Sequence, residues 1–426
     1  MFETLKNAWK IADLRKKLLY TLLIVVIFRI GCKIPVPYID PAAIQSLFSG
    51  GSLFGYLSIL TGGALKDVTI FAMGISPYIT SSIVVQLLAI AIPALERLSK
   101  EGEAGRKKLN QITRYVAVAL ALIQAFALYL TMKANGAIIS SVRDNWFAAV
   151  VIILSLTAGA MVVTWLGERI DQKGIGNGIS MILFAGILAG GPQVAIYFVQ
   201  LLGLGQIKYY IMIPVIVILF VLIIAFIVLM TNAERRIPVQ YAKRVVGRKM
   251  YGGQNSNIPL KLNMSGVMPI IFASSLMAIP GTIGAFIDVK EGGFWDKFFD
   301  LFSYTNWLYA VLFFVLIIAF NYFYVAIQYN PVEIANNLRK NSGGVPGIRP
   351  GKPTSDFITK ILGKITLMGG LFLGIMAILP IAVGAITGIN IALGGTTVMI
   401  IVGVALDTVR DLESQMMMRH YKGFLE

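Results

Sequence analysis

Few residues in this chain are of a type that could do chemistry, and the most suggestive run is a set of closely spaced glycines. Residues 171–180 have the sequence DQKGIGNGIS, with glycine at positions 174, 176 and 178. Glycine runs of this kind are typical of phosphate-binding loops, where backbone N–H groups approach the phosphate. Such loops follow a strand, and the P-loop class continues with Gly-Lys-Ser or Gly-Lys-Thr. Neither signal accompanies this run, so we favour a tight turn that leads into a helix over a nucleotide site.

The residue types of catalytic and metal centres are equally scarce. The chain has one cysteine, Cys32, in an apolar stretch, and one histidine, His420, near the C-terminus. These counts argue against a disulfide framework, a Cys/His metal cluster and Ser-His catalysis. No HExxH or GxSxG motif is present. We therefore expect a protein that is not an enzyme and that needs no cofactor or metal.

The composition predicts the elements that position these residues. Hydrophobic residues make up 57% of the chain and charged residues 14%, which is typical of a polytopic membrane protein. Ten apolar stretches are long enough to cross a bilayer as helices, so we expect an all-α membrane protein with ten transmembrane helices. The expected spans are 18–36, 70–92, 115–132, 147–166, 179–202, 210–231, 265–287, 305–327, 365–385 and 391–409.

The net charge of +16 follows the topology. The segments between spans alternate, with 29 Lys and Arg residues on one side and 6 on the other. The positive-inside rule then places both termini in the cytoplasm. No cleavable signal pattern follows the first apolar run, so we expect that run to be a retained span.

Ten spans divide into two halves of five, which predicts an inverted repeat around a central path. We expect a cytoplasmic amphipathic helix at 1–17, an N-terminal half at 18–202, a C-terminal half at 203–409 and a cytoplasmic tail at 410–426. A secondary transporter is the alternative for such a repeat. It normally carries charge near the membrane midplane. Here the acidic residues Glu168, Asp171 and Asp407 lie at span ends, which disfavours a transporter.

A short apolar segment, Phe54–Ala64, lies on the outer side of the membrane by this topology. It is too short to cross a bilayer, and glycines at 50, 51, 62 and 63 flank it as hinges. Such a segment has to be buried in protein or line a cavity.

Two long cytoplasmic segments exceed what simple connections need. Segment 232–264 interleaves apolar residues with cations, which predicts a short strand hairpin; it suits a phosphate backbone or an acidic protein surface, or only biases the topology. Segment 328–364 carries a Pro- and Gly-rich tip with Arg349, which is either a rigid docking element or a plain turn. The cations of the first segment are Arg235, Arg236, Lys243, Arg244, Arg248, Lys249 and Lys261.

Several long motifs, in order along the whole chain, resemble the SecY family, the central subunits of bacterial protein-conducting channels. The motifs are IFAMGISPYITSSIVVQLL (70–88), EGEAGRKKLNQITRY (101–115), DQKGIGNGIS (171–180), the segment 234–275, NPVEIANNLRKNSGGVPGIRPGKPT (330–354) and GGTTVMIIVGVALDT (394–408).

This resemblance implies an hourglass pore with an aliphatic ring at its waist and a plug on the outer side. A ring of apolar side chains closes a pore to ions by dewetting and offers no fixed hydrogen bonds to a passing polypeptide. Leu183 stands where the family more often has isoleucine, a change that keeps volume and apolarity. The implied ring residues are Ile75, Ile79, Ile179, Leu183, Ile271 and Ile400. The implied plug residues, within 54–64, are Phe54, Gly55, Tyr56, Leu57, Ile59, Leu60, Gly62 and Gly63.

The resemblance also implies a lateral gate, cytoplasmic docking loops and partners. The gate would release transmembrane segments into lipid between the second and third and the seventh and eighth spans. The implied gate residues are Gln86, Gln124, Ser274 and Ser275, and the docking residues are Arg235, Arg236, Lys243, Arg244, Arg248, Lys249 and Arg349. The implied partners are SecE and SecG subunits, the SecA ATPase, the ribosome, signal peptides, nascent chains and lipid. The implied function is translocation of unfolded polypeptides across the bacterial plasma membrane.

Overall fold

The computed structural model describes residues 2–40, 63–142, 145–203, 205–241, 244–246, 249–251, 255–284, 293, 298, 306–387 and 395–422. The chain forms two compact units. Unit 1 comprises Met1–Val215, Ser274–Ala310 and Pro380–Glu426, and unit 2 comprises Ile216–Ala273 and Val311–Leu379.

Unit 1 is built from helices, and several begin where the sequence carries a start signal. The Asn145 side chain accepts a hydrogen bond from the Phe147 N–H at the start of α7, as an N-cap residue does. Proline occupies the first turn of α4 and of α5, where its missing N–H is not needed. The helices are α1 (Phe2–Lys10), α2 (Ala12–Gly31), α4 (Ser76–Ala91), α5 (Pro93–Lys100), α6 (Glu103–Ala134), the 3₁₀ turn Ser140–Val142, α7 (Trp146–Lys173), α8 (Gly178–Gly203) and α15 (Gly395–Lys422).

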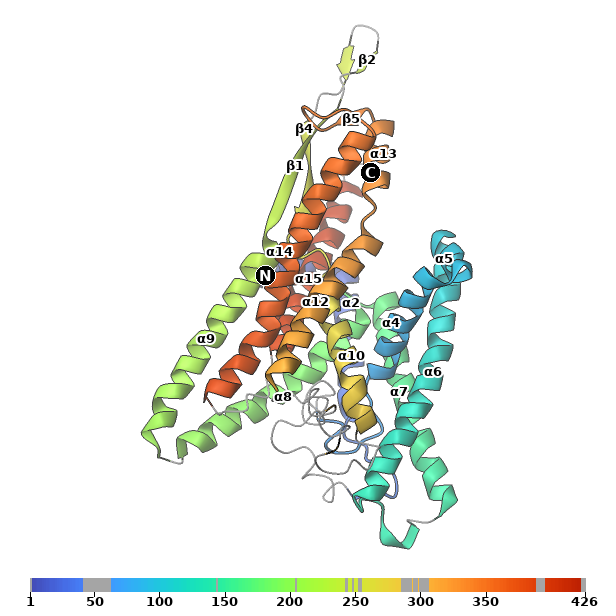
Figure 1. Ribbon diagram of the computed structural model, residues 1–426, viewed down its shortest axis with the longest axis vertical. Coiled ribbons are helices and arrows are strands. Elements are labelled where there is room, and N and C mark those ends of the chain that lie inside the picture. The colour runs from blue at the N-terminus through green and yellow to red at the C-terminus, as the bar shows by residue number, and fades with distance from the viewer. Residues whose placement is uncertain are drawn as a thin grey trace. The chain divides into compact units, whose positions relative to one another are not determined.

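The core of unit 1 packs the segment before α4 against α6 and α7. Val68, Ala72 and Met73 of that segment are buried together with Ala121 and Ala125 of α6. Residues 63–75 form turns and one isolated bridge, Thr69 to Pro35, so the expected second span does not run as one helix from 70 to 92. Its helix begins at Ser76, and α5 leaves it at an angle of 107° (Figure 1).

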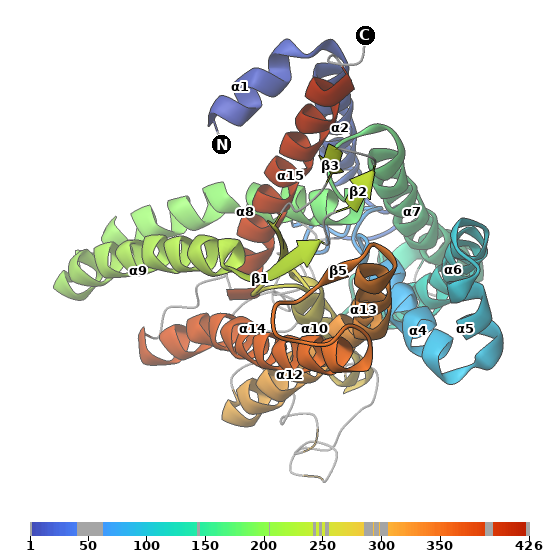
Figure 2. The ribbon, with the colours of Figure 1, turned by 90° about the horizontal axis from the view of Figure 1, so that it is seen from above.

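The C-terminal segment is helical where the structure describes it. Residues 410–422 continue α15, and the expected cytoplasmic tail at 410–426 stays a prediction. Figure 2 shows α1 beside the C-terminal end of α15. Ala8, Leu14, Ile175 and Leu412 form a buried cluster there. The N-terminal helix is therefore held by packing against α15, in addition to the amphipathic character that the sequence indicates.

Unit 2 combines helices with a three-stranded sheet, β4-β1-β5, and a separate two-stranded sheet, β2-β3. The predicted strands of segment 232–264 are confirmed: β1 and β4 pair antiparallel from Glu234↔Lys261 to Gln240↔Asn255, and β2 pairs antiparallel with β3. A short strand, β5, joins the free edge of β1. The elements with most of their residues in unit 2, or that enter it, are α9 (Ile207–Asn232), β1 (Glu234–Tyr241), β2 (Arg244–Val246), β3 (Lys249–Tyr251), β4 (Asn255–Lys261), α10 (Met268–Gly284), α12 (Trp307–Gln328), α13 (Pro331–Lys340), β5 (Gly343–Gly344) and α14 (Lys352–Thr387).

The sheet has its own hydrophobic contacts with the helices of unit 2. Ile237 and Val239 of β1 are buried, whereas Pro238 between them is exposed, as expected for a strand with one covered face. They pack in one cluster with Leu338 of α13 and with Ile358 and Leu362 of α14. Figure 1 shows β1 and β4 beside the upper part of α14. This cluster gives segments 232–264 and 328–364 a folded base.

A helix occupies each of the ten expected spans, which confirms the helical membrane-protein class. Six helical segments among the described residues are long and apolar enough to cross a membrane, and α4 with α5 would be a seventh. The count of ten spanning helices stays a prediction, as does the division into halves at residue 203. The six are Glu103–Ala134, Trp146–Lys173, Gly178–Gly203, Ile207–Asn232, Trp307–Lys340 and Lys352–Leu379.

Candidate functional site

Ile75 and Ile79 stand at the start of α4. Ile75 is the N-cap residue and lies just outside the helix. The Ile79 N–H donates to the Ile75 carbonyl at 3.1 Å, so the two residues still follow one another at the spacing of a helical turn. Ile75 is 3% exposed and Ile79 is 9% exposed. This turn is fixed by the segment packed before it.

Ile179 and Leu183 lie one turn apart on α8. The start of this helix meets the start of α4 at Gly167 of α7, against which the side chains of both Ile75 and Ile182 rest. Helix α8 also packs against α15, which carries the buried Ile400. Unit 1 thus brings together the helices of five of the six predicted ring residues. Ile271 is buried on α10 within unit 2.

The plug prediction falls mostly outside the described residues, since only Gly63 and Ala64 of segment 54–64 are described. Gly63 has a φ of +86°, a conformation that glycine adopts without strain. Ala64 is fully buried, and its carbonyl accepts hydrogen bonds from both the N–H and the hydroxyl of Thr69. The C-terminal end of the segment is therefore anchored at Ala64, directly after Gly63, whose backbone can adopt conformations that other residues avoid.

The glycine run forms the tight turn that the sequence predicts, and its N–H groups have partners within the chain. The Gly176 N–H donates to Asp411 Oδ2 at 3.1 Å, and the Gly178 N–H donates to Asp171 Oδ1 at 2.7 Å. The Ile175 N–H donates to the Thr21 hydroxyl at 3.1 Å. Internal oxygens thus stand where a phosphate would have to bind, which agrees with a structural turn.

Sequence reasoning did not single out Thr21 or Asp411. Asp411 is 235 residues away from Gly176 along the chain, and no local pattern indicates that pairing. Buried backbone N–H groups in a glycine run need hydrogen-bond acceptors. This requirement is the one signal in the sequence that indicates acceptors elsewhere in the chain.

The docking prediction maps onto the two sheets of unit 2 and the turn before α14. Arg235 and Arg236 are exposed on β1, and Arg236 pairs with Glu234 at 2.7 Å. Arg244 and Lys249 lie on the paired strands β2 and β3, while Lys243 and Arg248 are outside the described residues. Arg349 is exposed in the Pro- and Gly-rich turn. The hydroxyl of Thr354 donates to the Arg349 carbonyl at 2.8 Å, which fastens this turn to the first turn of α14.

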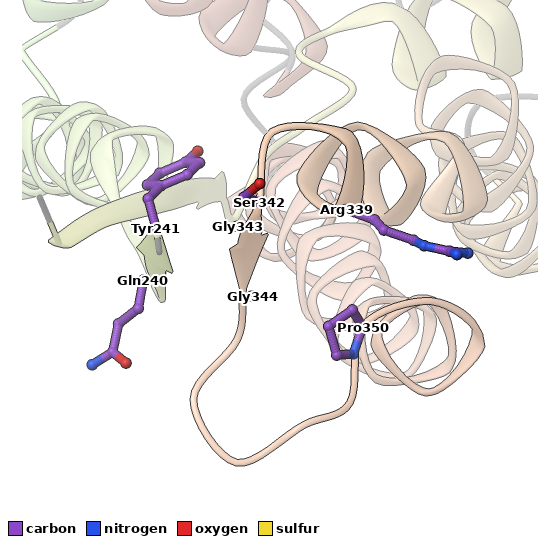
Figure 3. A pocket seen from close by; sticks show the side chains of 7 residues that line it. All are labelled: Gln240, Tyr241, Arg339, Ser342, Gly343, Gly344 and Pro350. Carbon is purple, nitrogen blue, oxygen red and sulfur yellow. The ribbon is translucent and has the colours of Figure 1, made fainter. Parts of the chain in front are cut away.

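A pocket of about 410 Å³ lies between β1, β5 and α13. Figure 3 shows Tyr241 and Gln240 on the β1 side, with Arg339 directed away from them. The Tyr241 ring covers Gly343, where an added Cβ would come within 2.8 Å of it. With its polar groups spread apart in this way, the pocket does not converge on a small ligand. It marks the seam where β5 joins the sheet.

The predicted gate residues lie on three helices. Gln86 is exposed on α4 and donates to the Ser82 hydroxyl at 3.1 Å. Gln124 is half-buried on α6, which packs against α4 through the hydrogen bond from the Ser81 hydroxyl to the Thr113 carbonyl. Ser274 and Ser275 are half-buried on α10. Their role as a gate stays a prediction.

Acidic side chains cluster at the C-terminal end of α7, where they form contacts between helices. Arg114 of α6 forms two parallel hydrogen bonds of 2.7 Å with the Glu168 carboxylate, and Asp171 caps the turn before α8. Among the described residues, no group of three or more His, Cys, Asp or Glu side chains is arranged to hold a metal ion. In the described part of the chain, these contacts join helices and do not form a reaction centre.

Comparison with known proteins identifies the family. A family model described as SecY matches residues 69–409. The chain belongs to the SecY family. Protein translocase subunit SecY of Streptomyces galbus is 42% identical over 445 residues, with 100% of both chains covered. The same subunit of Mycobacterium tuberculosis strain H37Rv is 41% identical over 448 residues, again with full coverage of both.

Solved structures agree with this SecY fold. The chain matches the structure of a protein conducting channel with a TM-score of 0.65 at 19% identity, covering 94% of this chain and 92% of that one. It matches Sec61 in the canine ribosome–channel complex with a TM-score of 0.62 at 18% identity, with the same two coverages. The fold and the full-length SecY relatives together show a multi-pass membrane protein that is a protein-translocation channel subunit. The secondary-transporter alternative is not favoured.

Proposed function

We propose that this chain forms a passive, gated pore that passes unfolded polypeptides across the plasma membrane and releases apolar segments sideways into lipid. The observation that carries the proposal is the SecY relationship over the whole chain, combined with buried aliphatic residues at five of the six predicted ring positions; the sixth, Ile179, is half-buried. Both termini would lie in the cytoplasm, as the distribution of Lys and Arg indicates. SecE and SecG would be the neighbouring subunits, and signal peptides and nascent chains would be the cargo.

In this proposal the six ring residues close the resting pore, and segment 54–64 seals it from the outer side. Support comes from the packing of α4, α8 and α15 in unit 1, which holds ring positions on anchored helices. The anchored Ala64 after Gly63 supports a plug that swings about its inner end. Gln86, Gln124, Ser274 and Ser275 would bias the lateral gate toward closure through hydrogen bonds between helices.

The ring is tested by Ile79→Asn and Ile271→Asn in the purified complex. We expect each variant to raise the resting ion conductance in planar bilayers by roughly tenfold, since a polar side chain lets water and ions enter a dewetted constriction. Deletion of residues 54–64 should act in the same direction. The matched control is Ile90→Asn, the same change at a residue of α4 that is 55% exposed. Equal conductance in Ile79→Asn and Ile90→Asn would remove the ring assignment.

We further propose that the cytoplasmic strands and the Arg349 turn dock the ribosome and the SecA motor, which supply the energy for transport. Exposed cations on β1 and at the turn suit the phosphate groups of ribosomal RNA and the acidic surface of a protein. The related Sec61 channel was solved in a ribosome–channel complex, which agrees with such a role.

Arg349→Glu tests the docking role of this turn. We expect it to lower SecA-driven translocation into proteoliposomes by roughly tenfold, because a reversed charge repels the surface it should meet. The yield of assembled complex should not change, since Arg349 is exposed. Lys360→Glu makes the same charge change at an exposed position of α14 and should translocate normally. Normal transport by Arg349→Glu would withdraw this residue from the docking surface.

A further inference from the structure

The turn at residues 174–177 joins three parts of unit 1 that are far apart in the sequence. It connects α7 to α8, and its backbone N–H groups donate to Thr21 of α2 and Asp411 of α15. The α7–α8 connection, α2 and α15 therefore meet at one turn. The donors are the N–H groups of Ile175 and Gly176, which lie between α7 and α8 and so need acceptors outside both helices.

Close packing at this turn leaves little freedom for its backbone. A Cβ at Gly178 would lie 1.9 Å from the Gly167 carbonyl oxygen, and one at Gly174 would lie 2.6 Å from the Thr21 hydroxyl. Gly176 has a φ of +75° and faces Thr408 of α15. The backbone of the turn therefore lies in direct contact with its neighbours. A hydrogen bond from this backbone fixes both the position and the orientation of the turn.

Asp411 is the link between this turn and α15. Its carboxylate accepts from the Gly176 N–H at 3.1 Å and from the Gln415 amide at 3.1 Å. Gln415 in turn accepts from the Lys17 ammonium at 2.9 Å. The carboxylate is therefore held in one orientation by a chain of contacts that begins in α2.

The same link connects two helices that carry predicted ring residues. Gly178 is the first residue of α8, so Ile179 follows at once and Leu183 comes one turn later. Asp411 lies on α15, about 16 Å along the helix from Ile400. A second contact between these helices joins the Thr408 hydroxyl to the Met181 sulfur at 3.6 Å. Along α15, Thr408 lies between Ile400 and Asp411. The register of α8 against α15 is thus set at their cytoplasmic ends.

We propose that Asp411 is a positioning residue for the pore: its bond to Gly176 holds α8 against α15 and so sets Ile179 and Leu183 relative to Ile400. This proposal rests on the ring assignment of the proposed function. Aspartate suits the role because its short side chain reaches the turn from the surface of α15 without disturbing either helix.

The test compares Asp411→Ala with Asp411→Asn in the full complex, reconstituted in lipid. Asparagine keeps an oxygen that can accept from the Gly176 N–H, whereas alanine removes the acceptor. Glu413→Ala is the charge-matched control. Glu413 is exposed on the same helix, and its carboxylate accepts from the Thr4 hydroxyl of α1 at 3.1 Å, away from the turn.

The first readout is the distance between spin labels on α8 and α15, measured by double electron–electron resonance. The labels are placed at Leu188→Cys and Met417→Cys, which are 55% and 69% exposed, in a Cys32→Ala background. We expect Asp411→Ala to shift or broaden the distance distribution by about 1–2 Å, the size of helix shifts at packed interfaces. Asp411→Asn and Glu413→Ala should match the parent. An unchanged distance distribution in Asp411→Ala would overturn the proposal, whatever conductance the ring variants show.

The second readout is resting conductance, measured beside Ile79→Asn. We expect Asp411→Ala to conduct several-fold more than Asp411→Asn at equal protein content, a difference that mere loss of stability would not give. Raised conductance in Ile79→Asn with parent-level conductance in Asp411→Ala would refute the positioning role alone. Parent-level conductance in both would refute the ring itself, and the positioning claim with it.

Discussion

Gly159→Ala is expected to destabilise the folded protein more than any other single methyl addition in α7. A Cβ at this position would lie 1.8 Å from the Ile70 carbonyl oxygen and 2.7 Å from its carbon. Both atoms belong to the backbone of the segment before α4, which cannot rotate away as a side chain would. Forced overpacking of this kind costs about 1–3 kcal/mol, and more where the backbone has to move. The thermal unfolding midpoint of the purified complex in detergent measures the loss.

Gly190→Ala provides the matched control for this prediction. Gly190 lies within α8, and no heavy atom comes within 4 Å of an added Cβ there. Alanine is favoured over glycine in a helix by about 0.5–1 kcal/mol, so this variant should unfold at the parent temperature or slightly above it. If Gly159→Ala behaves like Gly190→Ala, the close approach of α7 to Ile70 is not present in the protein.

Asn321→Leu is expected to have the next largest effect, in unit 2. Asn321 is 2% exposed on α12; it accepts from the Ser265 hydroxyl and donates to the Thr366 carbonyl of α14 at 2.7 Å. Leucine would leave the buried Ser265 hydroxyl without its acceptor. We expect a loss of about 1–2 kcal/mol, in the range measured for buried hydrogen bonds between helices. Thermal unfolding of the purified complex again provides the measurement.

A double variant separates the hydrogen bond from simple packing. Ser265→Ala removes the hydroxyl that Asn321→Leu leaves unpaired, so the pair should be less destabilised than the sum of the two single variants. Asn336→Ala, at an exposed position of α13, should change stability by no more than about 0.5 kcal/mol. Additive effects of Ser265→Ala and Asn321→Leu would show that the two residues act independently.

The sequence predicted the helices better than their ends. Apolar length is a local property, so a helix was found at each expected span. The ends depend on packing: α6 begins at Glu103 and not at 115, and α15 runs on to Lys422 because α1 covers it. Strand β5 gave no signal, since its two glycines have no preference for a strand and pair only because β1 offers an edge.

The predicted site depended on family resemblance more than on residue patterns. Ile75 and Ile400 are buried like many other aliphatic residues, so neither burial nor spacing distinguishes ring from core. The turn at 174–177 was predicted from its glycines, but its partners were not. Thr21 and Asp411 contact the turn only in the folded protein, and a single sequence has no pattern that predicts such a long-range contact.

Helix α14 connects the Arg349 turn rigidly to the rest of the protein. The turn is tied to the first turn of α14 by Thr354, and α14 continues without a break from Lys352 to Thr387, a length of about 54 Å. Its N-terminal end is braced by Ile358 and Leu362 in the cluster with β1. A stiff rod with a braced upper end transmits a push along its axis and does not fold under it. Force applied at the tip therefore reaches the membrane-embedded part of the helix as displacement, and little of it is lost as bending of a loop.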